Sequence, residues 1–318
     1  MQIDRLQPYL NKTSLFMQEP FFSDVQIFKD YEGYFIPICS NEQKKANYIT
    51  VDRNDSDLFC LHETKKVSYL LVENLSIKPL LILNGEIFDG AMQDRVANET
   101  VLIPSRSSVE INVSCVEQGR WAHKTKAFSR GKNMFNYHSK GVKDLYNNSL
   151  KHNQPSGSVQ SNVWSSISEK QRRMGVFSRT GSINDTYEKY EESIKHLREK
   201  IIEQDNQVGL LVMIPGKYIG IDLFTNGDIF KKYKERLYNS HLIELIEKVR
   251  NGRRDFRKQI DSFMLELMYS REVYAKKMLG EEYSIYDRTS QVSSTCLALN
   301  EDLIHLTAMK NIENRHAR

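Results

Sequence analysis

Cysteine is scarce in this sequence, and long apolar runs are absent. The chain of 318 residues has four Cys, none of them in a C-x-x-C pair, which argues against a disulfide framework and against a zinc site built from paired cysteines. No apolar run approaches the roughly 20 residues that cross a bilayer as a helix. The first residues also lack the basic-then-apolar order of a signal peptide. We therefore expect a cytoplasmic protein with reduced thiols and no membrane partner.

Common catalytic and metal-binding motifs are missing as well. The eight histidines show neither the H-x-x-x-H nor the H-E-x-x-H spacing, so the sequence predicts no metal site. It contains no G-x-S-x-G nucleophile motif, no phosphate-loop lysine and no G-x-G-x-x-G dinucleotide motif. The sequence therefore names no cofactor.

Positive charge is present but concentrated. The formal net charge is only +4, yet residues 119–154 hold eight Lys or Arg against one acid, Asp144, with aromatic residues among them. Basic and aromatic side chains interleaved in this way suit a phosphate-bearing ligand or nucleic acid. A solvated loop explains the same composition. Both interpretations of this segment stay open.

Short strand-like segments dominate the first part of the chain. From Val25 to Pro104, and again in "VEINVSCVEQ" at 109–118, segments rich in Val, Ile, Leu, Tyr and Phe are separated by Asn, Asp, Ser, Gly and Pro, which favours an antiparallel sandwich or barrel. Helical periodicity follows, and a hairpin around "PGK" at 215–217 and three closing strand-like segments come later. The sequence thus predicts an α+β fold with an N-terminal antiparallel β-sandwich or barrel-like part, a helical middle and a C-terminal mixed α/β part returning to strands.

The predicted domain organisation has three parts. Residues 1–121 are expected to form the β-rich sandwich-like domain. Residues 122–162 are expected to be a basic loop or arm, ending in the linker-like "NQPSGSVQSN". Residues 163–318 are expected to be a mixed helix and strand region that packs on the first domain.

Two motifs carry a family resemblance. "GEIFDGAMQDRV" at 85–96 and "CVEQGRW" at 115–121 fit the pattern G-E-x-x-x-G-x-x-Q-x-R followed by C-V-E-x-G-R-W. With "VGLLVMIPGKYIGIDLF" at 208–224 and "DLIHLTAM" at 302–309, the chain resembles the ARG and rhodanese-phosphatase-superfamily-associated protein family. That family is named for its association with ADP-ribosylglycohydrolases and rhodanese-phosphatase proteins. The resemblance therefore implies ADP-ribose or related nucleotide metabolism.

The polar residues of the two motifs form the candidate site. The candidate catalytic carboxylates are Glu86, Glu117 and Asp94, and the candidate ligand-binding residues are Gln93, Arg95, Arg120, Trp121 and Asp222. Paired arginines can hold a phosphate or carboxylate in bidentate geometry, and a carboxylate can act as a base or bind ribose hydroxyls. Three glycines of the motifs, Gly85, Gly90 and Gly119, would let backbone approach a ligand.

Structural roles for the same residues are the alternative. Glu86–Arg95 and Glu117–Arg120 could be ion pairs that tie strand ends together. Asp222, which follows an apolar strand, could cap the helix that comes next.

Three functions follow as hypotheses. The first is a cytoplasmic ligand-binding protein that recognises an anionic, nucleotide- or ADP-ribose-like small molecule. The second is a hydrolase that acts on the same ligand class with a carboxylate base. The third is an interaction protein whose basic segment, residues 119–154, binds nucleic acid or an acidic partner. A homo-oligomer is compatible with each.

Overall fold

The fold is mixed α+β, as the sequence predicted. The computed structural model describes residues 26–28, 31–41, 45–52, 57–136, 157–247, 256–268, 272–277, 281–286, 292–299 and 302–312. The chain divides into two compact units: the first consists of Met1–Lys45, Leu197–Tyr233 and Glu244–Arg318, and the second of Ala46–His196 and Lys234–Ile243. No helix in the described part of the chain is both long and apolar enough to cross a membrane.

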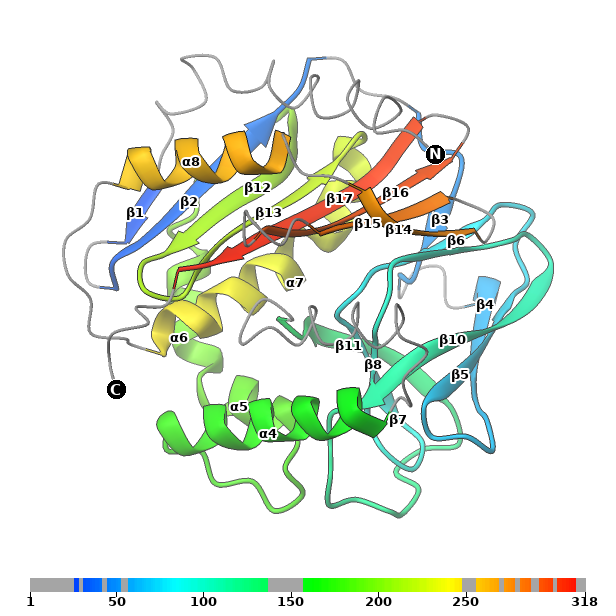
Figure 1. The fold of residues 1–318 in the computed structure, drawn as a ribbon. Helices are drawn as coiled ribbons and strands as arrows, with labels where there is room; N and C mark the ends of the chain where they lie inside the picture. The colour runs from blue at the N-terminus through cyan, green and yellow to red at the C-terminus, as the bar shows by residue number, and fades with distance from the viewer. Residues whose placement is uncertain are drawn as a thin grey trace. The chain divides into compact units, whose positions relative to one another are not determined.

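An eight-stranded antiparallel sheet is the framework of the first unit, in the order β1-β2-β12-β13-β17-β16-β15-β14 (Figure 1). Its strands are β1 (Gln26–Phe28), β2 (Gly33–Cys39), β12 (Gln207–Ile214), β13 (Tyr218–Phe224), β14 (Glu272–Lys277), β15 (Glu281–Tyr286), β16 (Val292–Leu299) and β17 (Asp302–Asn311). The predicted N-to-C arrangement is not confirmed, because β1 and β2 share this sheet with strands from the C-terminal half. Local periodicity marks a strand but does not specify its partner.

The β12–β13 hairpin lies at the centre of this sheet. Every residue of β12 is buried, as its continuous apolar sequence predicts for a central strand. The strands pair antiparallel, and Gly216 takes a φ of 75° in the turn, which confirms the predicted hairpin. On one face, helix α8 (Phe256–Met268) buries Ile260, Phe263 and Leu267 against sheet residues including Leu211 (Figure 1).

The second unit contains two smaller sheets. The six-stranded sheet has the antiparallel order β11-β7-β8-β10-β5-β4. Its strands are β4 (Phe59–Glu63), β5 (Tyr69–Asn74), β7 (Glu86–Gly90), β8 (Arg95–Ala97), β10 (Ser107–Cys115) and β11 (Phe128–Met134). A three-stranded sheet joins β3 (Ile49–Thr50), β6 (Leu80–Ile82) and β9 (Val101–Ile103), with β3 and β6 parallel.

In the described residues, four helices besides α8 begin at positions that local chemistry explains in part. They are α4 (Gly157–Arg173), α5 (Ile183–Lys189), α6 (Glu191–Arg198) and α7 (Gly227–Ile246), whose residues are divided between the two units. Ser182 caps α5 by accepting a hydrogen bond from the Asn184 N–H, and Asn226 Oδ1 accepts one from the Ile229 N–H at 2.9 Å at the start of α7. Such caps satisfy free amides at a helix start.

The segment predicted to be a basic loop has regular structure at both of its described ends. Residues 128–134 form β11, and α4 begins at Gly157, within the stretch predicted to be a linker. The residues from 137 to 156 lie outside the described part of the chain, and with them several basic residues of the proposed nucleic-acid segment.

Candidate functional site

The candidate site is built around the turn between β7 and β8. Gly90 ends β7 with a φ of 121°, and Ala91 follows with a φ of 45°, so the turn uses backbone conformations that favour glycine. The Gly90 N–H donates to Asp94 Oδ1 at 2.8 Å and closes the turn. A Cβ atom on Gly90 would lie 2.3 Å from Thr125 Oγ1. The space beside this glycine is therefore occupied by the chain itself.

The other two motif glycines also adjoin this chain's own backbone. A Cβ atom on Gly85 would lie 2.6 Å from the Phe135 carbonyl oxygen, and one on Gly119 would lie 3.1 Å from Thr180 Cα. These glycines allow two chain segments to approach closely. Their presence is explained without a ligand.

Arg120 holds the turn against the end of β10. Its Nε donates to Glu117 Oε2 at 2.7 Å, and its Nη2 donates to Asp94 Oδ1 at 3.0 Å. Nη1 donates to the Ala91 carbonyl oxygen at 2.6 Å, and Nη2 lies 3.3 Å from that of Gly90. Burial lowers the pKa of Arg120, but hydrogen bonds and charges from the two acids outweigh burial and raise the pKa above its ordinary value. All three guanidinium nitrogens are thus engaged within the chain.

Two aspartates of the turn share one amide group. Asn184 Nδ2 donates to Asp89 Oδ1 at 2.9 Å and to Asp94 Oδ2 at 3.1 Å. Burial raises the pKa of Asp89, and the charge of Asp94 raises it further, against smaller opposing effects of Asn184 and Lys124. Burial also raises the pKa of Asp94, although the Gly90 N–H opposes this. Asp89 is half-buried whereas Asp94 is buried, so Asp89 is the accessible acid of the pair.

The pKa of Glu117 is shifted in the opposite direction to those of Asp89 and Asp94. Its Oε1 accepts a hydrogen bond from Thr180 Oγ1 at 3.0 Å, and its Oε2 accepts one from the Asp94 N–H at 3.3 Å. Burial alone would raise the pKa of Glu117, but Arg120, Thr180 and the Asp94 N–H lower it below the ordinary value. Glu117 therefore remains ionised beside two acids that hold protons more tightly. We call the following set the Arg120 cluster: Asp89, Asp94, Glu117, Arg120 and Asn184.

Arg95 and Gln93 lie in a buried network that adjoins the cluster. Arg95 Nη1 donates to Gln93 Oε1 at 3.0 Å and contacts Cys115 Sγ, while Gln93 Nε2 donates to the Glu117 carbonyl oxygen at 3.0 Å. Burial raises the pKa of the Cys115 thiol to about 11, although Arg95 opposes this. Arg95 is 5% exposed, and the nearest oxygen of Glu63 is 3.9 Å from its Nη2. The contacts of Arg95 are internal to the protein.

Glu86 belongs to a different ion pair. Its Oε2 lies 3.2 Å from Arg236 Nη1 on α7, and its Oε1 accepts a hydrogen bond from the Leu83 N–H at 3.1 Å. Its side chain is fully buried. Glu86 therefore pairs with Arg236, whereas the structural alternative drawn from the sequence paired it with Arg95.

Trp121 and Asp222 differ sharply in exposure. Trp121 follows Arg120 directly and is 58% exposed, so its indole can stack on a planar ligand. Asp222 lies in β13 of the first unit, is 5% exposed, and has its Oδ1 3.4 Å from His305 Nε2. The cap of α7 is Asn226 rather than Asp222.

Three residues of this region were not among the candidate site residues that the sequence suggested: Asp89, Thr180 and Asn184. The start of α5 is tied to the end of β10, since the Ile183 N–H donates to the Val116 carbonyl oxygen at 3.0 Å. This connection places Asn184 over the aspartates of the turn. The cap at Ser182 is a visible sequence signal, but Asn184 is separated from Asp89 by 95 positions.

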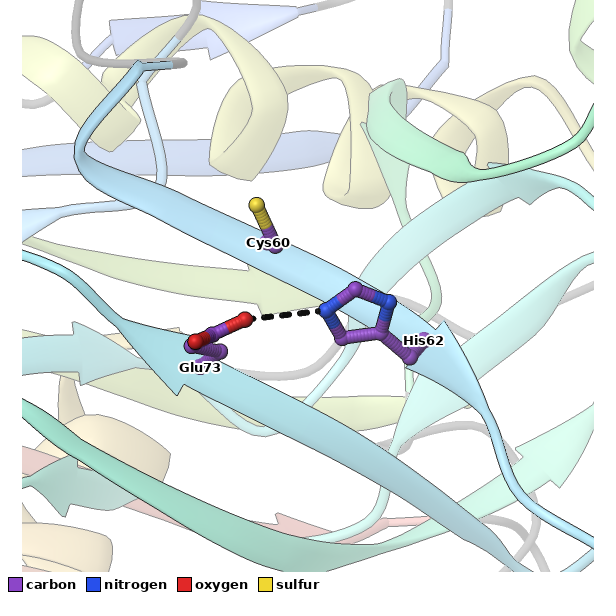
Figure 2. Close-up of side chains that lie close together, drawn as sticks. All are labelled: Cys60, His62 and Glu73. Carbon is purple, nitrogen blue, oxygen red and sulfur yellow. Dashed lines mark hydrogen bonds and ion pairs between the residues drawn. The ribbon is translucent and has the colours of Figure 1, made fainter.

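A separate group of potential metal ligands lies on the six-stranded sheet. Cys60 and His62 project from β4 and Glu73 projects from β5 (Figure 2). One ligand atom from each residue lies within 4.8 Å of the other two. The spacing C-x-H on a strand places both side chains on one face, and this signal was not used in the sequence-based expectation of no metal site.

The comparisons with known proteins agree with the motif resemblance. The family model described as the ARG and Rhodanese-Phosphatase-superfamily-associated Protein domain matches residues 34–309. No curated protein and no solved structure matches the chain.

Proposed function

Because the chain belongs to the ARG and rhodanese-phosphatase-superfamily-associated protein family, we propose that it is a cytoplasmic protein that binds an anionic, nucleotide- or ADP-ribose-like small molecule at the Arg120 cluster. The association in the family name supports this ligand class. The family name alone assigns no residue to the ligand, so the assignment rests on the chemistry of the cluster.

The observation that carries the proposal is the half-buried carboxyl group of Asp89. It shares Asn184 with Asp94 and lies within electrostatic range of the exposed Lys124. A carboxyl of this kind accepts hydrogen bonds from paired ribose hydroxyls. Lys124 can supply positive charge to a phosphate, and exposed Trp121 can stack on a base.

The arginines have a positioning role in this proposal. Arg120 is engaged by two acids and by backbone carbonyls, and an anion would have to displace those contacts. Arg120 therefore fixes the turn that presents Asp89 and does not itself clamp the phosphate. Arg95 contributes in the same indirect way, through Gln93.

Calorimetric titration with ADP-ribose tests the proposal. Asp89→Asn is expected to weaken binding by about 1–3 kcal/mol, the range for a lost charged hydrogen bond. Lys124→Ala should weaken it as well, whereas Lys126→Ala, a matched exposed lysine of the same segment, should not. No heat of binding with ADP-ribose, ADP or ribose 5-phosphate, or equal effects of the two lysine variants, would overturn the proposed site.

Hydrolysis of the same ligand class is the second candidate, and the divergent acid strengths favour it. Raised pKa values at Asp89 and Asp94 beside a lowered pKa at Glu117 are the pattern by which neighbouring carboxyls divide into proton donor and ionised base. Asp89 is the accessible donor and Glu117 is the ionised base, whereas the raised pKa of Asp94 makes it less suited to act as the base that the sequence suggested. Glu86 is fully buried in its pair with Arg236 and is less suited to contact substrate.

Chromatography of ADP-ribose derivatives incubated with the protein distinguishes binding from hydrolysis. A hydrolase should release free product in proportion to enzyme concentration, and Asp89→Asn should lower the rate at least a hundredfold, as expected for a lost general acid. Binding without release of product over long incubation would support ligand binding and rule out hydrolysis of these ligands.

A further inference from the structure

We propose that Cys60, His62 and Glu73 bind a divalent transition-metal ion of the zinc class. The site lies on the six-stranded sheet of the second unit, and the proposal does not depend on the ligand bound at the Arg120 cluster. It rests on strand register, on the distances among the three ligand atoms and on the exposure of the side chains.

Strand register brings the three residues to one face. β4 and β5 are antiparallel, and Cys60 pairs directly with Glu73. Paired residues of an antiparallel ladder point to the same face, and residues two apart on a strand do so too. His62 therefore shares the face of Cys60, and Figure 2 shows the three side chains on that face.

The distances are close to those of a coordination shell. His62 Nε2 and Glu73 Oε2 are 3.2 Å apart. All three ligand atoms lie within 4.8 Å of one another. With metal–ligand bonds of zinc length, tetrahedral geometry separates ligand atoms by about 3.3–3.6 Å. The imidazole and the carboxylate, 3.2 Å apart, lie just below this range. Cys60 Sγ lies within 4.8 Å of both atoms, and coordination would bring it closer to them.

Exposure and ligand chemistry fit a surface metal site. The side chains of His62 and Glu73 are 48% and 41% exposed, and Cys60 is half-buried. An ion can therefore enter from solvent, and water can occupy a fourth position. Thiolate, imidazole and carboxylate together suit zinc and chemically similar ions better than magnesium or calcium, which prefer oxygen ligands alone.

A simple surface ion pair between His62 and Glu73 is the competing explanation. It accounts for their 3.2 Å contact but gives no role to Cys60, which lies opposite Glu73 in the register. In the described sheet β4 is the terminal strand, and a metal ion would link it to β5 through side chains in addition to the backbone ladder. Metal binding adds its free energy to the folded state in such cases.

Cobalt substitution tests the proposal directly. Chelator-treated protein titrated with Co²⁺ should develop a sulfur-to-cobalt charge-transfer band that saturates at one equivalent and disappears on addition of Zn²⁺. The band should be lost in Cys60→Ser and retained in Cys39→Ser, a half-buried control thiol in the first unit. Zn²⁺ affinity should fall at least tenfold in His62→Ala and in Glu73→Gln but stay unchanged in Glu110→Gln, an exposed glutamate on β10.

A second measurement uses the unaltered protein. Zn²⁺ should slow alkylation of Cys60 at least tenfold, measured by mass spectrometry of the peptides, while alkylation of Cys39 in the same sample stays unchanged. A cobalt complex without the sulfur band, equal metal binding by Cys60→Ser, or unchanged alkylation of Cys60 would each overturn the proposal.

Discussion

Arg120 and Glu117 are joined through two nitrogens and one oxygen. Nε and Nη2 of the arginine lie 2.7 Å and 2.6 Å from Glu117 Oε2. The side chains are 13% and 8% exposed, so little solvent screens the pair. The same guanidinium holds Asp94. This contact fixes the end of β10 to the β7–β8 turn and so determines where Asp89 is presented.

Arg120→Ala should destabilise the protein strongly. It leaves two buried acids, Glu117 and Asp94, without their cation, and breaking a buried pair in this way costs about 3–5 kcal/mol. Urea unfolding followed by circular dichroism measures the change, with Lys126→Ala as the exposed control. If the free energy of unfolding falls by less than about 1 kcal/mol, protonation or hydration of Glu117 and Asp94 compensates for the lost arginine.

Arg95→Ala should lower stability as well. Arg95 is 5% exposed and bonds Gln93 and Cys115, and a buried acceptor left without its donor costs about 1–3 kcal/mol. The comparison is with Arg179→Ala, an exposed arginine of the same unit. Should Arg95→Ala melt like the unaltered protein yet bind ligand more weakly, Arg95 would contact the ligand itself.

Asp89→Asn should change how stability depends on pH. The pKa of Asp89 is raised in the folded protein. The stability that Asp89 contributes is therefore complete below its unfolded pKa of about 3.8, and it is lost as the pH rises through its higher folded pKa. The free energy of unfolding of the unaltered protein minus that of the variant should therefore fall over this range. Urea titrations at a series of pH values measure it, and a difference that stays constant with pH would contradict the raised pKa.

Glu86 and Arg236 should show strong energetic coupling. Both are buried, with Oε2 and Nη1 3.2 Å apart, so Glu86→Leu or Arg236→Met alone leaves a buried charge and should cost about 3–5 kcal/mol. The double variant should be more stable than either single variant, because neither charge remains. Additive losses in the double-mutant cycle would show that the pair contributes no interaction energy.

The sequence alone determined the fold class and which residues form several strands and turns. The central strand β12 is apolar throughout, and "PGK" lies between β12 and β13. Both signals are local, because burial and turn chemistry act through residues adjacent in the chain. The two motifs at 85–96 and 115–121 likewise contain four of the residues that the structure groups together: Asp89, Asp94, Glu117 and Arg120.

Only the tertiary structure decided which residues meet. Asn184 donates to Asp89, which is 95 positions away in the sequence, and Glu86 pairs with Arg236, which is 150 positions away. The metal-ligand group depends on the register of β4 against β5. Strand pairing and ion pairing over such separations are selected by the total burial and hydrogen bonding of the folded chain, and no local pattern of residues records that choice.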